Sequence, residues 1–206
     1  MAKLYFYYSA MNAGKSTTLL QSSYNYRERG MNTLLFAPQI DQRFGSPAIY
    51  SRIGLKQEAI AFHENFNFFT YTLDFENKLE NLKCILVDEA HFLKKSQVAQ
   101  LLEITIDIGI PVLAYGLRSD FLGEPFEGSK YLLAWAHELI EIKTICHCGR
   151  KATMNMRIDS SGRPITSGNQ IQIGGNESYI STCVHHFREA VDTFRHYGKE
   201  KNFIAK

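Results

Sequence analysis

The residues most able to do chemistry begin near the start of the chain, in the run SAMNAGKS at residues 9–16. An apolar stretch, residues 4–8, leads into this run and a helical pattern follows it, which is the setting of a phosphate-binding loop. The N–H groups of such a loop and of the helix behind it point at phosphate oxygens, and Lys15 adds a full positive charge. The hydroxyl of Ser16 is then a ligand for Mg²⁺. The predicted ATP phosphate-binding residues are Ser9, Ala10, Met11, Asn12, Ala13, Gly14, Lys15 and Ser16.

A pair of carboxylates, Asp88 and Glu89, follows the continuous apolar run 84–87. Such a run is typical of a central parallel strand, and ligands of open α/β sheets bind beyond the carboxyl ends of the strands. We therefore expect Asp88 to hold Mg²⁺ with Ser16, and Glu89 to accept a proton from the group that attacks the γ-phosphate. Water and a substrate hydroxyl need the same base, so the pair leaves both an ATPase and a kinase open. Taken alone, the two acids could simply cap the following helix.

Cysteine and histidine gather in the last third of the chain. Cys146 and Cys148 form one short turn and Cys183 and His186 form another, with 34 residues between Cys148 and Cys183. Thiolate and imidazole suit a tetrahedral, structural Zn²⁺ that closes a module too small to bury its own core. His186 is the first choice for the fourth ligand, and His185 and His147 are the alternatives.

The elements that must position these residues have the pattern of an α/β protein. Strands are predicted at residues 4–8, 33–37, 84–87 and 111–115, and helices at 17–29, 75–82 and 95–108. This alternation predicts a P-loop-like, mainly parallel sheet with helices on both faces. We expect an ATP-binding domain at 1–145, a small zinc-binding domain at 146–190 and a tail at 191–206. The polar run 157–179 between the two zinc turns predicts a long loop that covers the substrate.

Composition limits the class of protein. The chain has 206 residues, of which 45% are hydrophobic and 21% are charged, and its formal net charge is +2. These values are typical of a globular protein, and a dedicated nucleic-acid binder would be more basic. No apolar stretch approaches the roughly 18 to 20 residues that cross a bilayer. We therefore expect a cytoplasmic protein without nucleic-acid or membrane partners.

Taken in order, these motifs resemble the thymidine kinases of the cellular and bacterial type, and the bacterial branch in particular. The resemblance rests on residues 9–16 (SAMNAGKS), 41–44 (DQRF), 87–92 (VDEAHF), 115–121 (YGLRSDF), 146–152 (CHCGRKA) and 173–179 (IGGNESY), with Cys183 and His186. The chain departs from the family pattern at Ser9, where glycine is usual, and at His91, where glutamine is common. Its first zinc turn is CxC in place of CxxC.

The resemblance implies transfer of the γ-phosphoryl group of ATP to the 5′-hydroxyl of thymidine, giving dTMP in nucleotide salvage. It implies a homotetramer, feedback inhibition by dTTP, Glu89 as the general base and Arg43 as a cation that meets the phosphates during transfer. It also places Asp88, Glu89, Ala90 and His91 at the ATP site. The implied thymidine-binding residues are Met11, Phe92, Leu117, Phe121, Phe126, Ile171, Gln172, Ile173, Gly174 and Tyr179.

Two other classes of function fit some of these motifs. A zinc-containing P-loop ATPase coupled to nucleic acid would use the same loop, acidic pair and metal turn, although such a motor is usually larger and more basic. A non-catalytic, nucleotide-dependent regulator would keep the loop without needing Glu89.

Overall fold

The structure, a computed structural model, describes residues 1–39, 47–76, 81–170 and 178–197. The chain folds into two compact units. Unit 1 comprises residues 1–8, 14–117 and 126–142, and unit 2 comprises residues 9–13, 118–125 and 143–206. The domain limits expected from the sequence, at residues 145 and 190, stay predictions.

Unit 1 is built on a six-stranded sheet. Its strands are β1 (Leu4–Ser9), β2 (Asn32–Pro38), β5 (Ile60–Phe62), β6 (Leu82–Val87), β7 (Val112–Leu117) and β8 (Glu138–Glu141). They lie in the order β5-β2-β6-β7-β1-β8, and β1 with β8, β2 with β5, β2 with β6, and β6 with β7 run parallel. A separate antiparallel pair joins β3 (Ala48–Tyr50) to β4 (Lys56–Glu58). The predicted mainly parallel sheet is confirmed.

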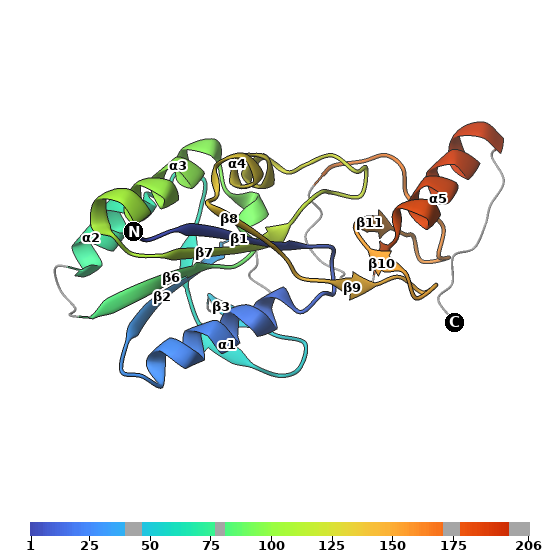
Figure 1. Cartoon of the computed structure of the whole chain (residues 1–206). Helices are drawn as coiled ribbons and strands as arrows, with labels where there is room; N and C mark the ends of the chain where they lie inside the picture. Colours follow the sequence, from blue (N-terminus) through green and yellow to red (C-terminus); the bar gives the residue numbers. More distant parts are fainter. Residues whose placement is uncertain (40–46, 77–80, 171–177, 198–206) are drawn as a thin grey trace. The chain divides into compact units, whose positions relative to one another are not determined.

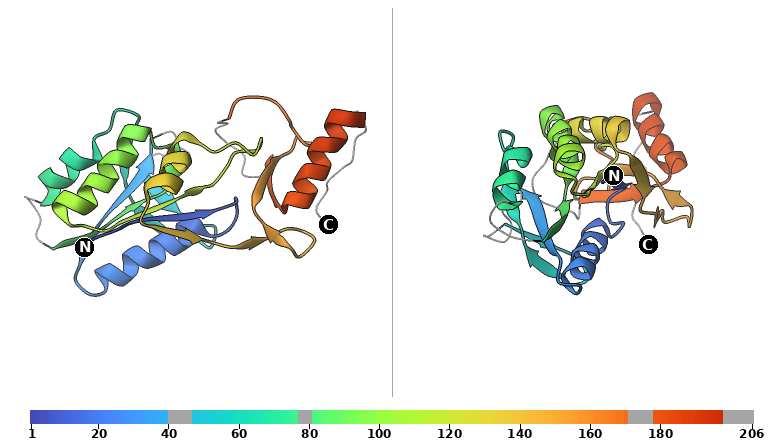
Figure 2. Two further views of the ribbon diagram at one scale, coloured as in Figure 1. Left: turned by 45° about the horizontal axis from the view of Figure 1, so that its top comes forward. Right: turned by 60° about the vertical axis from the view of Figure 1, so that its left-hand side comes forward.

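Helices cover both faces of this sheet, as predicted (Figures 1 and 2). Helix α1 (Lys15–Arg27) lies on one face, and α2 (Phe68–Glu76), α3 (Lys95–Glu103) and α4 (Glu127–Trp135) lie on the other. Short turns of helix follow β6 at Ala90–Phe92 (η1) and extend α3 at Ile104–Ile108 (η2). Each face has its own buried cluster, with Leu19 and Tyr115 in one and Phe36 and Leu101 in the other. Because apolar side chains fill both faces, the strands read as nearly continuous hydrophobic runs.

Helix α2 spans Phe68–Glu76 and so begins seven residues before the helix predicted at 75–82. Residues 77–80 of that prediction lie outside the described part of the chain, and Leu82 belongs to β6. Tertiary packing favours the earlier start. Phe68 is fully buried and its ring lies 5.0 Å from that of Phe36. Asn67 caps the helix, since its side-chain oxygen accepts a hydrogen bond of 2.9 Å from the N–H of Thr70. Asn67 is the sequence signal that would have placed the start correctly.

The described residues of unit 2 form two small antiparallel strand pairs and one helix. The pairs are β9 (Thr144–Ile145) with β10 (Lys151–Ala152) and β11 (Met154–Arg157) with β12 (Tyr179–Thr182), and the helix is α5 (Val184–Tyr197). One buried cluster of its described residues consists of Cys146, Ala152 and Cys183, and Phe121, Met156 and Ala190 are also buried.

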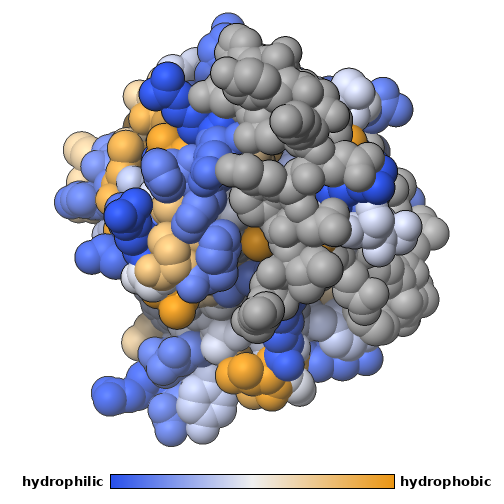
Figure 3. Space-filling view, turned by 90° about the vertical axis from the view of Figure 1, so that its right-hand side faces the viewer, coloured by the Kyte–Doolittle hydropathy of each residue, from blue (hydrophilic) through white to orange (hydrophobic). Residues whose placement is uncertain are grey.

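The surface carries apolar side chains singly or in small groups. Figure 3 shows one face of the molecule, on which such groups are scattered among hydrophilic residues. Among the residues of unit 2 whose burial is described, the exposed large apolar side chains are Leu122, Ile145 and Val184. Isolated exposed apolar residues of this kind are ordinary on protein surfaces. Among the described residues, no helix combines the length and the apolar character needed to cross a membrane.

The close approach of α4 to η1 gives a test of the fold. A Cβ added at Gly128 would lie 2.5 Å from the carbonyl oxygen of Ala90 and 2.9 Å from that of His91. Since neither neighbour is the end of a flexible side chain, we expect Gly128→Ala to cost about 1–3 kcal/mol of unfolding free energy. The control Lys130→Ala, at an exposed position of the same helix, should cost less than about 0.5 kcal/mol. Urea unfolding measures both, and equal stability of the two variants would contradict the packing described.

Candidate functional site

The loop between β1 and α1 has the backbone of an anion site. Gly14, the residue before α1, has φ 84°, and Asn12 has φ 60°, so two left-handed residues bend the chain between strand and helix. Glycine adopts this conformation without strain, and no side chain of Gly14 competes for the N–H groups of the first helical turn. Ser9 is a residue of β1 whose hydroxyl donates to the carbonyl of Ala10 at 2.7 Å. An extended residue at this position does not need to be glycine.

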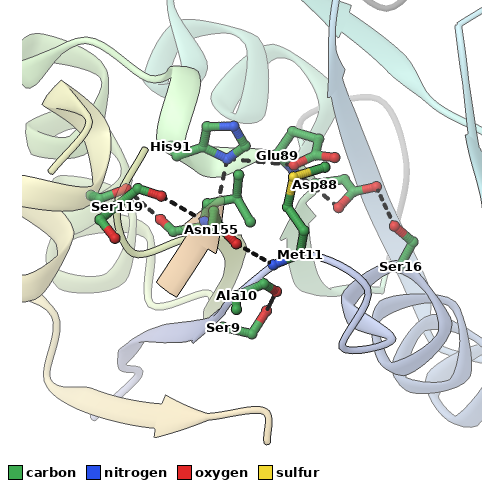
Figure 4. A network of polar contacts seen from close by, with 11 residues as sticks. Ser9, Ala10, Met11, Ser16, Asp88, Glu89, His91, Ser119 and Asn155 are labelled. Carbon is green, nitrogen blue, oxygen red and sulfur yellow. Dashed lines mark hydrogen bonds and ion pairs between the residues drawn. The ribbon is translucent and has the colours of Figure 1, made fainter. Parts of the chain in front are cut away.

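Unit 1 buries a lysine and a carboxylate at the carboxyl edge of its sheet. Lys15 and Asp88 are 8% and 6% exposed. The hydroxyl of Ser16 donates to Asp88 Oδ2 at 3.0 Å, a contact drawn in Figure 4. Burial raises the pKa of Asp88 to about 7 and the charge of Glu89 adds to the rise, while Ser16 and Lys15 oppose it. Burial lowers the pKa of Lys15, against the attraction of Glu89 and Asp88. The hydrogen bond between Ser16 and Asp88 brings the two predicted magnesium ligands into contact.

Glu89 is held in an uncommon backbone conformation directly after Asp88. Its φ of 48° and ψ of 40° are left-handed, which costs a residue with a Cβ about 1–2 kcal/mol. Its N–H donates to Asp88 Oδ1 at 3.0 Å. The two carboxylates thus leave the end of β6 in a fixed relation, with the side chain of Glu89 33% exposed. A buried acid beside a partly exposed one is an arrangement that separates a metal ligand from a base.

His91 lies beside Glu89 and is neutral in the folded protein. Its Nδ1 accepts a hydrogen bond of 3.3 Å from the N–H of Leu117 and is 3.4 Å from Glu89 Oε2. Burial, and then the charge of Lys15, hold the pKa of His91 well below its usual range. Its ring also lies 4.1 Å from Phe92 and 4.6 Å from Phe126, centroid to centroid. Ala90, the other residue placed here by the resemblance, is fully buried.

The predicted nucleoside-binding residues fall in both units. In unit 1 the rings of Phe92 and Phe126 meet edge to face at 6.1 Å, and the carbonyl of Leu117 accepts a hydrogen bond from Ser129. In unit 2, the guanidinium of Arg157 lies 5.3 Å from the ring centre of Phe121. The other predicted members of unit 2 are Met11 and Tyr179. Arg43 and residues 171–174 lie outside the described part of the chain.

The four predicted zinc ligands come together in unit 2. The ligand atoms of Cys146, Cys148, Cys183 and His186 all lie within 4.8 Å of one another. His186 Nδ1 is 3.3 Å from Cys146 Sγ and 3.5 Å from Cys183 Sγ, and the sulfurs of Cys148 and Cys183 are 3.9 Å apart. A tetrahedron with Zn–S of about 2.3 Å and Zn–N of about 2.0 Å has edges of about 3.5–3.8 Å. The cluster is therefore compatible with Zn²⁺.

The two alternative histidine ligands lie close to this cluster, and His147 Nδ1 is 3.6 Å from Cys146 Sγ. The ring of His147 stacks on that of His186, with centroids 4.2 Å apart, and the ring of His185 lies 5.5 Å from it. Neither belongs to the group of four converging ligand atoms. The geometry therefore favours His186 as the fourth ligand.

Two polar residues of unit 2 that the sequence did not reveal, Asn155 and Ser181, contact Met11 of the phosphate-binding run. Asn155 Oδ1 accepts a hydrogen bond of 2.7 Å from the N–H of Met11, as Figure 4 shows, and the hydroxyl of Ser181 donates to the carbonyl of Met11. Asn155 is 2% exposed. The sequence offered one signal for Asn155, which is its place between two methionines in a strand. A polar amide among apolar neighbours is buried with specific hydrogen-bond partners.

Comparisons with known proteins point to one family. The sequence profile of the family described as thymidine kinase matches residues 2–187. The chain is 62% identical over 196 residues to a thymidine kinase of Legionella pneumophila (strain Paris), covering 94% of each protein. It is 63% identical over 188 residues to a thymidine kinase of Coxiella burnetii, covering 91% of this chain and 96% of the other. A thymidine kinase of Vibrio cholerae is 58% identical over 191 residues, which cover 93% of this chain and 99% of the other.

The family match at residues 2–187 spans the loop, the acidic pair and the four clustered cysteine and histidine residues. This chain belongs to the thymidine kinase family.

Proposed function

We propose that this protein transfers the γ-phosphoryl group of ATP to the 5′-hydroxyl of thymidine, giving dTMP and ADP. The observation that carries the proposal is the contact of Asp88 with Ser16, at the carboxyl edge of the sheet and beside the buried Lys15. Membership of the thymidine kinase family supports thymidine as the acceptor. Phosphoryl transfer depends on positioning and charge neutralisation, which are what these side chains supply.

Each side chain has a role in this proposal. Lys15 neutralises the β- and γ-phosphates, and Ser16 and Asp88 hold Mg²⁺. When bound, the metal spreads the negative charge that develops on the transferred group. Glu89 accepts the proton of the 5′-hydroxyl as that oxygen attacks, which the single exposed carboxylate of the pair is suited to do. Arg43, from the motif at residues 41–44, is proposed to add positive charge at the phosphates.

We propose that the nucleoside base is bound by the apolar and aromatic residues Met11, Phe92, Leu117, Phe121, Phe126 and Tyr179. Apolar walls would pack the pyrimidine ring and its methyl group, and backbone groups of residues 171–174 would read its polar edge. Exclusion of water by such a pocket matters because a base that reaches water turns a kinase into an ATPase.

We propose a structural Zn²⁺ in unit 2, since all four positions of a tetrahedral site are filled by protein ligands. Backbone N–H groups of Cys148 and Cys183 and the ring of His186 overcome the effect of burial and lower the pKa of Cys146 to about 6. This shift favours the thiolate, which is the form that binds metal.

Assembly and regulation are proposed from the family resemblance. They comprise a homotetramer, feedback inhibition by dTTP, a cytoplasmic location and no nucleic-acid partner. The net charge of +2 supports the last of these.

The first test replaces the proposed base. Glu89→Gln should lower the rate of dTMP formation about 100- to 10,000-fold, because proton transfer loses its acceptor. Incubation of purified protein with labelled ATP, Mg²⁺ and a panel of nucleosides measures this rate, with the exposed Glu103→Gln of α3 as control. Activity of Glu89→Gln equal to that of the control would refute the role of Glu89. ATP hydrolysis stimulated by DNA, with no labelled dTMP from the unaltered protein, would refute the proposed function and support the ATPase alternative.

The second test uses the neutral His91. The unfolded chain protonates this histidine near pH 6.5, whereas burial and Lys15 keep it uncharged in the folded protein. The folded-state pKa is depressed, so stability is lost as pH falls below about 6.5, by up to about 1.4 kcal/mol per pH unit. Urea unfolding at about pH 7 and about pH 5 should therefore show a smaller difference for His91→Gln than for the unaltered protein. The exposed His63→Gln should keep the full difference, and an unchanged difference in His91→Gln would contradict this prediction.

The third test separates two adjacent histidines. Purified protein should contain one zinc per chain, and His186→Gln should lower both the zinc content and the melting temperature, because a ligand of the cluster is lost. His185→Gln should retain the metal. Elemental analysis and thermal unfolding measure both effects, and zinc lost from His185→Gln but kept by His186→Gln would reverse the assignment.

A further inference from the structure

Both polar backbone atoms of Met11 are bound by side chains of one strand pair. Met11 N–H donates to Asn155 Oδ1 at 2.7 Å, and Met11 C=O accepts from the hydroxyl of Ser181. Asn155 of β11 and Ser181 of β12 lie directly opposite each other in the register of the pair. Opposite residues point to the same face of an antiparallel pair. The two side chains therefore hold Met11 from the same face, one on its N–H and one on its C=O.

The asparagine is itself fixed in orientation. Its Nδ2 donates to the carbonyl of Ser119 at 2.7 Å, and its side chain is buried, with 2% exposure. A backbone N–H needs an oxygen opposite it and a carbonyl needs an N–H, so only one of the two amide orientations satisfies both neighbours. The N–H of Arg118 in turn donates to the carbonyl of Ser9 at 3.2 Å. Residues 9–13 and 118–125 of unit 2 are thus tied to β11 and β12 and to each other.

These contacts lie next to the bend of the loop. Asn12, the residue after Met11, is left-handed at φ 60°, a conformation that costs residues with a Cβ about 1–2 kcal/mol. The two hydrogen bonds of Met11 fix the backbone directly before the left-handed Asn12. A loop that is already in its binding conformation loses less entropy when a ligand arrives, so its affinity is higher.

We propose that Asn155 and Ser181 are positioning residues that preorganise the phosphate-binding loop for ATP by holding the backbone of Met11. The proposal rests on the proposed function, in which residues 9–16 bind the phosphates. Ser181 lies two residues before the metal-cluster residue Cys183, so the zinc content of every variant must be measured beside its affinity for ATP.

The test compares neighbouring residues of β12. Ser181→Ala removes the hydroxyl that donates to Met11, and Ser181→Thr keeps a hydroxyl at the same position. Thr182→Val is the control, because Thr182 is fully buried and, in the described part of the chain, its hydroxyl has no hydrogen-bond partner. Asn155→Ala is a second variant, which leaves Met11 N–H and Ser119 C=O without their partner.

Calorimetric titration with ATP gives the dissociation constant, and steady-state kinetics give KM for ATP and kcat. Loss of one hydrogen bond to the loop should weaken ATP binding about five-fold in Ser181→Ala. We expect a larger loss in Asn155→Ala and, in Ser181→Thr and Thr182→Val, values within about two-fold of the unaltered protein. Zinc content should be the same in all of them.

Two results would overturn the proposal while the unaltered protein makes dTMP. One is an affinity for ATP in Ser181→Ala that matches Thr182→Val. The other is a lower melting temperature in Ser181→Ala with no change in affinity for ATP or in KM, which is the mark of a purely structural residue. If the unaltered protein binds ATP but makes no dTMP, the proposed function fails. The effect of Ser181→Ala on ATP binding still decides whether Asn155 and Ser181 are positioning residues.

Discussion

The burial of charged groups at the carboxyl edge of one parallel sheet is the constraint on which unit 1 depends. Lys15 and Asp88 are removed from water, which costs several kcal/mol for each ion unless other charges and hydrogen bonds compensate. Ser16 and the N–H of Glu89 supply part of this compensation. The proposed ligand, ATP with Mg²⁺, would add charges of both signs. The site is therefore suited to the ligand that a kinase must bind, and less suited to a small neutral molecule.

His91, a titratable neighbour of the proposed base, carries no positive charge in the folded protein. His91 lies next to Glu89 but receives an N–H from Leu117 and is enclosed by Phe92 and Phe126. A neutral imidazole does not form a strong ion pair with the Glu89 carboxylate, whereas the charge of Lys15 attracts that carboxylate. The left-handed backbone at Glu89 turns this residue away from the path of the strand.

Unit 2 is built differently, since two of the four predicted metal ligands, Cys146 and Cys183, belong to its small buried cluster. The four predicted ligands bring the turn at Cys146 next to the end of β12. The same strand presents Ser181 to the backbone of Met11. The predicted metal site, the paired strands and residues 9–13 are thereby parts of one folded unit.

The sequence alone determined the α/β class, the phosphate-binding run, the acidic strand end and the two zinc turns, because each depends on residues close together in the chain. Local patterns also predicted most elements of the parallel sheet, since strands buried on both faces are continuously apolar. They placed the start of α2 seven residues too late, because the packing of Phe68 on Phe36 favours an earlier start. Only the tertiary structure showed that Asn155 and Ser181, more than 140 residues from Met11, contact its backbone. It also showed that the ring of His186, the first choice from the sequence, lies with the three cysteine sulfurs. Hydrogen bonds and metal ligation depend on distance and direction in space, which spacing along a chain does not specify.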